Sequence, residues 1–200
     1  MFKSILTTIL LAVLASGAAA DVFYAKDTKS LSVTGPTTAY QIHQAATVMQ
    51  NEEVVTVTLA GPGGDFYSGL RLGRLIREEG AVVVISENTI CVSACAFAAL
   101  GADRVIVDGE LWFHAPYIRM APTTLSILEI SQNIGAGYID MASYLISMGV
   151  PTSFARDLLS ETTPSKFIVI DAGLQISRIR ATEKLWGKAV YNYRYETAAS

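Results

Sequence analysis

The chain has only two histidines and two cysteines, so few of its side chains can perform acid–base or nucleophilic chemistry. Ser93 lies in a CVSAC segment, residues 91–95, at the predicted start of a helix of small residues. The positive end of the helix macrodipole and the free N–H groups there can stabilise an oxyanion. An ordinary N-cap serine is the competing interpretation. His114 follows an apolar strand and precedes Ala115-Pro116, so it lies at a strand end, where α/β folds hold functional side chains; a hydrogen-bonded core histidine is the alternative.

A glycine-rich turn supplies a third element. Residues 61–64 (GPGG) follow a β-branched run, and glycines let a ligand approach the backbone and its N–H groups. Together with Ser93 and His114, this turn indicates an acyl-transfer site. The turn matches neither nucleotide-binding motif, because Gly69 is followed by Leu70 rather than lysine and Phe66 stands where a glycine is needed.

Cys91 and Cys95 have several possible roles. Two cysteines in an exported protein suggest a disulfide, which is feasible if Cys91 precedes the helix, and which would then hold the loop that carries Ser93. Two buried, inert thiols are an equal alternative, and a cysteine nucleophile paired with His114 ranks below serine. Two cysteines without a second ligand pair do not make a zinc site, so we expect no metal and no cofactor. His43, on the polar side of an amphipathic pattern, is interpreted as a surface histidine.

Strands must alternate with helices to position these residues. The periodicity predicts helices over 39–50, 68–79 and about 93–100, and one long helix or a helix pair from 123 to about 148. It predicts strands over 54–59, 81–85, 104–107 and 111–113. A loop is expected over 86–90, and Gly135 and Gly137 are expected to soften the last helix. This order predicts one α/β domain whose short strands pair in parallel.

The first twenty residues are typical of a secretory signal. Lys3 is followed by an apolar stretch over 5–14 and by Ala18-Ala19-Ala20, a small-residue cleavage site. The stretch is shorter than the ~20 residues of a membrane span, and no later segment is long enough either. The prediction is a signal peptide over 1–20, a domain over 21–200, and a periplasmic or secreted protein without a membrane span in its mature chain. Removing Lys3 makes the net charge of −3 more negative, which disfavours nucleic acid as a partner.

The segment from Leu59 to Pro116 resembles the Clp-type serine peptidases of the Clp/crotonase fold, especially their exported relatives. The matching motifs are GPGG at 61–64 before a helix with Gly69, CVSAC at 91–95, Gly101-x-x-Arg104, and FHAP at 113–116. The resemblance implies a Clp/crotonase-like spiral of short parallel strands with helices.

By position, the resemblance also implies roles for individual residues. Ser93 would be the nucleophile and His114 the general base. The N–H groups of Gly63 and Ala94 would form the oxyanion hole, and residues 123–150 the helix that packs subunits in a homo-oligomer.

The third catalytic residue of the family is an acid just before a phenylalanine-containing strand. Alignment on Phe167 places Ser165 there, with Asp157, Glu161 and Asp171 as the nearby acids. The sequence therefore predicts an exported serine hydrolase, a peptidase that acts on peptide or protein substrates without an ATP-driven partner. The alternatives are a non-catalytic binding or assembly module of the same fold, and a crotonase-like acyl-thioester site.

Overall fold

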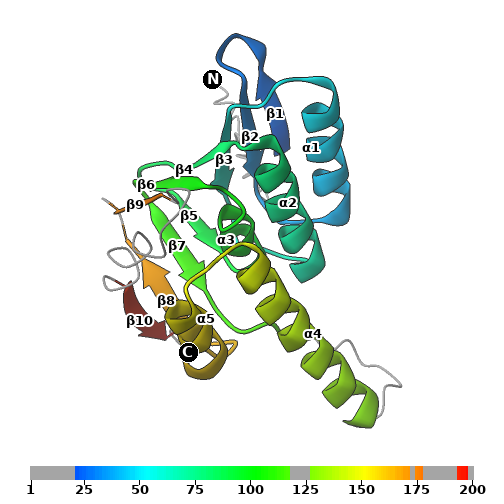
Figure 1. The fold of residues 1–200 in the computed structure, drawn as a ribbon, viewed down its shortest axis with the longest axis vertical. Coiled ribbons are helices and arrows are strands. Elements are labelled where there is room, and N and C mark those ends of the chain that lie inside the picture. The colour runs from blue at the N-terminus through cyan, green and yellow to red at the C-terminus, as the bar shows by residue number, and fades with distance from the viewer. Residues whose placement is uncertain (1–20, 118–126, 172–173, 178–192, 198–200) are drawn as a thin grey trace, which may run out of the picture.

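The computed structural model describes residues 21–117, 127–171, 174–177 and 193–197 (Figure 1). The predicted secretory signal over 1–20 lies outside these residues, as do the first residues of the helix expected from 123.

The larger sheet contains six strands in the order β1-β2-β3-β4-β6-β9. Its central strands β2, β3, β4 and β6 pair in parallel, as expected. The expectation is wrong at both edges, where β1 pairs with β2 and β9 with β6 in antiparallel fashion. A single 3₁₀ turn joins β1 to β2, and so short a connection can only make a hairpin. The bounds are β1 Asp21–Ala25, β2 Ser30–Thr34, β3 Thr56–Ala60, β4 Val82–Ile85, β6 Arg104–Val107 and β9 Leu174–Ser177.

A second sheet of four strands carries the site, in the order β10-β8-β7-β5. Its strands are β5 Ile90–Val92, β7 Glu110–Phe113, β8 Lys166–Ile170 and β10 Tyr193–Thr197. β5 lies where the sequence analysis expects a loop that leads into a helix, and three residues are too few to show a period. The N–H of Gly61 donates to Ile90 O (2.9 Å) and the N–H of Val92 donates to Gly61 O (2.9 Å), so the glycine turn is bonded to β5.

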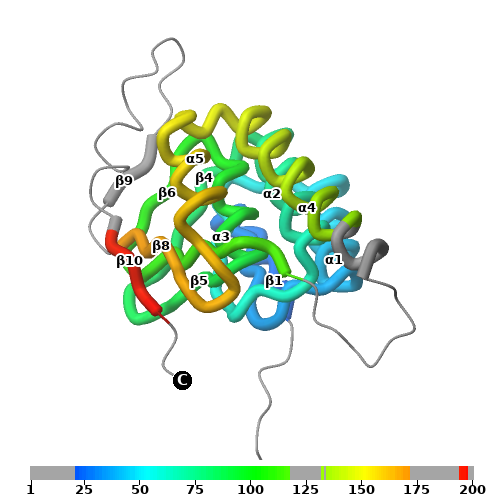
Figure 2. The backbone as a smooth tube through the Cα atoms, turned by 90° about the horizontal axis from the view of Figure 1, so that it is seen from below, coloured from blue at the N-terminus to red at the C-terminus, as the bar shows by residue number. Residues whose placement is uncertain are grey.

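The described residues form five α-helices that cover the sheets, namely α1 Ala39–Asn51, α2 Phe66–Glu79, α3 Ala94–Ala99, α4 Ile127–Ser147 and α5 Thr152–Glu161. α4 is continuous through Gly135 and Gly137, so the expected soft point is wrong. The C-terminal part of α4 lies along α2 (Figure 2), where Tyr67 Oη bonds Asp140 Oδ2 (3.0 Å). Just beyond α4, Met148 O accepts from Arg77 Nη2 (3.3 Å). None of the helices in the described ranges is long and apolar enough to cross a membrane.

Edge-to-face aromatic rings cross the core from α2 to α5. Phe66, Phe97, Phe113 and Phe154 follow one another with centroids 5.6–5.7 Å apart. Such ring pairs add stabilisation beyond the area that they bury. The row joins α2, α3, β7 and α5 beneath the site.

The short helix α3 lies between α2 and the strands β5 and β7 (Figure 1), with all six residues buried. A Cβ atom at Gly69 would overlap the carbonyl oxygen of Ala94, and one at Gly101 would overlap that of Gly73. Tyr144 on α4 closes the other end by donating to Phe97 O (2.8 Å). Backbone-to-backbone contact between α2 and α3 therefore sets the position of the residue just before α3.

We expect Gly69→Ala to lower the free energy of unfolding by about 2 kcal/mol, because the added methyl must displace the backbone of α3. Urea denaturation measures the change. The matched control is Gly135→Ala, an exposed helix position with open space around it, which should gain about 1 kcal/mol in helix propensity. Equal midpoints for Gly69→Ala and the wild type would contradict the packing argument.

Candidate active site

Ser93 occupies the turn between β5 and α3 in a conformation that non-glycine residues rarely adopt. Its φ is 56° and its ψ −121°. Its N–H donates to Trp112 O (2.8 Å) on β7, and its carbonyl accepts from the N–H of Phe97 (2.9 Å), so strand and helix both hold the turn. Ser93 is the N-cap residue, yet its side chain makes no capping hydrogen bond. A sharp, strained strand-to-helix turn of this kind exposes the nucleophilic serine in α/β-hydrolases.

A disulfide spans this turn. Cys91 on β5 and Cys95 on α3 are joined with an S–S length of 2.02 Å and a Cα–Cα distance of 5.3 Å. Of the roles that the sequence leaves open, the structure has the bridge rather than two free thiols. The bridge fits because Cys91 lies in a strand and not in the helix. A cysteine nucleophile would need a free thiol, which a bridged cysteine does not have.

Gly63 lies directly against the Ser93 turn. A Cβ atom at Gly63 would stand 2.8 Å from Ser93 Cβ and 3.1 Å from Ala94 N, and its φ of +82° also favours glycine. The carbonyl of Gly63 accepts from Thr37 N (2.8 Å), while no backbone carbonyl of the described residues accepts from the Gly63 N–H. Ala94 is the first residue of α3, so its N–H has no partner within the helix. Two available N–H groups thus lie next to Ser93.

His114 is buried at the end of β7, with 6% of its surface exposed. Its Nδ1 lies 2.7 Å from Ala115 O. The imidazole contacts the rings of Phe167, edge-on at 5.1 Å, and Tyr117, at 5.5 Å. Burial lowers the pKa of His114 and the bond to Ala115 partly opposes the shift. The imidazole is therefore neutral at neutral pH, as a general base must be.

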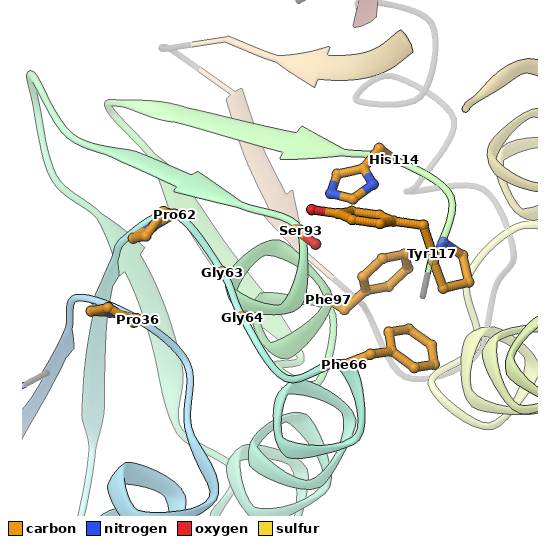
Figure 3. A pocket seen from close by; sticks show the side chains of 10 residues that line it. Pro36, Pro62, Gly63, Gly64, Phe66, Ser93, Phe97, His114 and Tyr117 are labelled. Atoms are coloured by element: carbon orange, nitrogen blue, oxygen red, sulfur yellow. The ribbon is translucent and has the colours of Figure 1, made fainter. Parts of the chain in front are cut away.

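Ser93 and His114 line one cavity of about 460 Å³ (Figure 3). The ring of Tyr117 reaches from the chain after His114 into this cavity, with its hydroxyl toward Ser93. Phe66 and Phe97 add apolar walls. Within the described ranges, no three His, Cys, Asp or Glu side chains gather as a metal site requires.

Ser165 is exposed, and its hydroxyl lies 3.4 Å from Thr163 Oγ1. Each nearby acid contacts a basic side chain: Asp157 bonds Arg156 (3.3 Å), Glu161 bonds Lys166 (3.4 Å) and Asp171 pairs with Arg194.

On β8, the position opposite His114 holds a phenylalanine rather than an acid. The antiparallel register pairs Phe113 with Ile168, so the next step along the strands brings Phe167 to His114. Among the described residues, the hydrogen-bond partner of His114 is the main-chain carbonyl of Ala115.

Sequence reasoning missed two features of the site. Tyr117 lines the cavity three residues beyond His114, and no local pattern in the sequence predicts that position. The Ala115 carbonyl is a main-chain group, which residue type does not reveal, although the proline after it signals a restricted backbone. His43 is exposed on α1, as expected.

No protein-family model matches the chain, and no curated protein matches it in sequence. Solved structures do resemble it. A variant of the membrane-bound stomatin-specific protease 1510-N matches with a TM-score of 0.54 at 15% identity, over 80% of this chain and 82% of that one. A second variant, in complex with a substrate peptide, matches with 0.54 at 15%, over 84% of both chains. A variant of ClpP1 from Listeria monocytogenes matches with 0.52 at 14%, over 66% of this chain and 80% of that one. The chain therefore has the α/β fold of Clp-type peptidases.

Proposed function

We propose that this protein is an exported serine peptidase that cleaves peptide segments by acyl transfer, without an ATP-driven partner. The observation that carries the proposal is that Ser93 lines the same cavity as the buried His114. Ser93 lies on a strained turn, and its hydroxyl makes no capping hydrogen bond to the helix. A peptide substrate is supported by the fold, since one structure that resembles this chain holds a substrate peptide.

In the proposed reaction, Ser93 Oγ attacks the scissile carbonyl while His114 takes its proton. The C–N bond then breaks as the imidazolium returns the proton to the leaving amine, and water hydrolyses the acyl-serine. The N–H groups of Gly63 and Ala94 stabilise the negative oxygen of the tetrahedral intermediate.

Export is supported by the secretory pattern over 1–20 and by the Cys91–Cys95 disulfide, because disulfides persist in oxidising compartments. The proposed action without an ATP-driven partner rests on the proposed export, together with the lack of a nucleotide-binding motif in the chain itself. A homo-oligomer is supported by apolar side chains exposed along α4, namely Ile134 (39%), Ile139 (68%) and Ile146 (74%).

A fluorophosphonate probe should label the wild-type protein and leave Ser93→Ala unlabelled, because the probe reacts with an activated serine. Gel fluorescence or intact mass detects the adduct. Ser160→Ala, at an exposed serine on α5, is the matched control and should label like the wild type. Absence of labelling in folded wild-type protein would contradict the peptidase and favour the non-catalytic binding module.

The labelling rate should remain high below pH 6.5, the ordinary pKa of histidine, and fall only in more acidic solution. The reason is that burial lowers the pKa of His114, so the neutral base persists as the pH decreases. Because the unfolded histidine keeps its ordinary pKa, the unfolded state binds more protons than the folded state below pH 6.5. The free energy of unfolding therefore decreases as the pH falls through this range. Labelling rates measured across pH test this, and a half-maximal rate above 6.5 would contradict it.

Replacing both cysteines, Cys91→Ala with Cys95→Ala, should slow labelling at least tenfold, because the bridge holds the two sides of the Ser93 turn. The closed loop is short, so its entropic contribution to global stability is only about 2 kcal/mol. Circular dichroism should therefore still report a folded chain. The unreduced wild type should weigh two hydrogens less than the reduced protein, and equal masses would contradict the bridge.

A further inference from the structure

We infer that the main-chain carbonyl of Ala115, held in place by Pro116, orients His114 in the role that a carboxylate has in a catalytic triad. The inference rests on the proposed function, since it concerns how the proposed base is positioned. Ala115 and Pro116 are positioning residues, because they affect the reaction only by orienting the imidazole of His114.

The contact fixes the tautomer of the imidazole. Nδ1 lies 2.7 Å from Ala115 O, and a carbonyl oxygen can only accept a hydrogen bond. Nδ1 must therefore carry the proton, and in the neutral ring Nε2 is left as the acceptor. A general base that removes a serine proton needs this tautomer, with an unprotonated nitrogen available to the hydroxyl.

The direction of the carbonyl is itself constrained. A residue that precedes proline is confined to extended conformations, which limits where the carbonyl of Ala115 can point. The peptide bonds of the described residues are all trans, so no second isomer redirects it. Ala115 is fully buried, so water does not reach the carbonyl to compete for it.

Two aromatic rings restrict rotation of the His114 side chain. Phe167 meets it edge-on at 5.1 Å from β8, and Tyr117 lies at 5.5 Å. With Nδ1 bonded and two rings in contact, rotation of the His114 side chain would break the hydrogen bond and both ring contacts. Orientation and tautomer are then set without a carboxylate at Phe167 or Ser165.

The first test reads the tautomer directly. His43→Gln leaves His114 as the sole histidine in the full mature chain, so ¹⁵N-histidine labelling gives one imidazole in a two-bond ¹H–¹⁵N spectrum at a pH where it is neutral. We expect a protonated Nδ1 and an unprotonated Nε2. A spectrum dominated by the Nε2–H form would overturn the inference.

The tautomer measurement and the labelling experiment test two different claims, so each can contradict one claim and leave the other standing. A Nδ1–H imidazole in a protein that the fluorophosphonate does not label would overturn the peptidase while the Ala115 contact stands. Labelling by a protein whose His114 is Nε2–H would overturn the contact while the peptidase stands.

The second test releases the carbonyl. Pro116→Ala frees the backbone of Ala115, so we expect a mixture of tautomers and labelling at least tenfold slower. Pro151→Ala makes the same chemical change at the start of α5 and should alter neither. If Pro116→Ala keeps a pure Nδ1–H form and the wild-type rate, the positioning role of the proline is overturned.

The third test adds the acid that the alignment would place before β8. Ser165→Asp puts a carboxylate at an exposed position that faces Thr163, so we expect the labelling rate to stay within twofold of the wild type. A rate increase of tenfold or more would mean that the imidazole lacks an orienting group, and it would overturn the inference.

Discussion

The site depends on the close approach of two helices, in which Gly69 and Gly73 of α2 lie against the backbone of α3 and of Gly101 just after it. Gly69 allows Ala94 to lie against α2, where any Cβ would overlap its carbonyl oxygen. Because Ala94 directly follows Ser93, this contact sets where the strained turn stands. The disulfide and the bond from Ser93 N to Trp112 O then hold the turn from the side of the strands. Gly63 repeats the same principle, since a side chain there would collide with Ser93.

The machinery of the proposed site is made largely of main-chain groups. In the proposed reaction the N–H groups of Gly63 and Ala94 would be the donors for an oxyanion, while the carbonyl of Ala115 accepts from His114. Main-chain groups have positions fixed by the fold, so they lose no side-chain entropy when they act. The use of main-chain groups instead of charged side chains is consistent with a chain in which only 16% of residues are charged. The nearby acids contact basic side chains instead, as Glu161 does with Lys166 and Asp171 with Arg194.

Sequence reasoning succeeded where a period or a motif was long enough to read. The strand at Arg104–Val107 and the helix α1 follow clear patterns. Ser93 and His114 were singled out because so few candidates exist, and the structure places both in one cavity. β5 could not be predicted, because three residues have no period and their pairing with β7 is a tertiary choice. The antiparallel pairing of the edge strands β1 and β9 could not be predicted either, because strand pairing is a tertiary choice. Phe167 was recognised as an alignment anchor, yet its contact with His114 follows only from the β7–β8 register.

Among the described residues no carboxylate is bonded to His114, and the expected cost of this lack is smaller than the loss of a triad acid. In one studied triad, replacing the acid by its amide costs about 10⁴ in rate, and the loss arises from the wrong tautomer of the imidazole. A carbonyl that accepts from Nδ1 enforces the right tautomer, so that part of the loss is avoided. What a neutral carbonyl does not supply is the charge that stabilises the imidazolium in the transition state. His114 and the Ala115 carbonyl should thus form a correctly oriented base that lacks this stabilising charge, and burial separately lowers the pKa of His114.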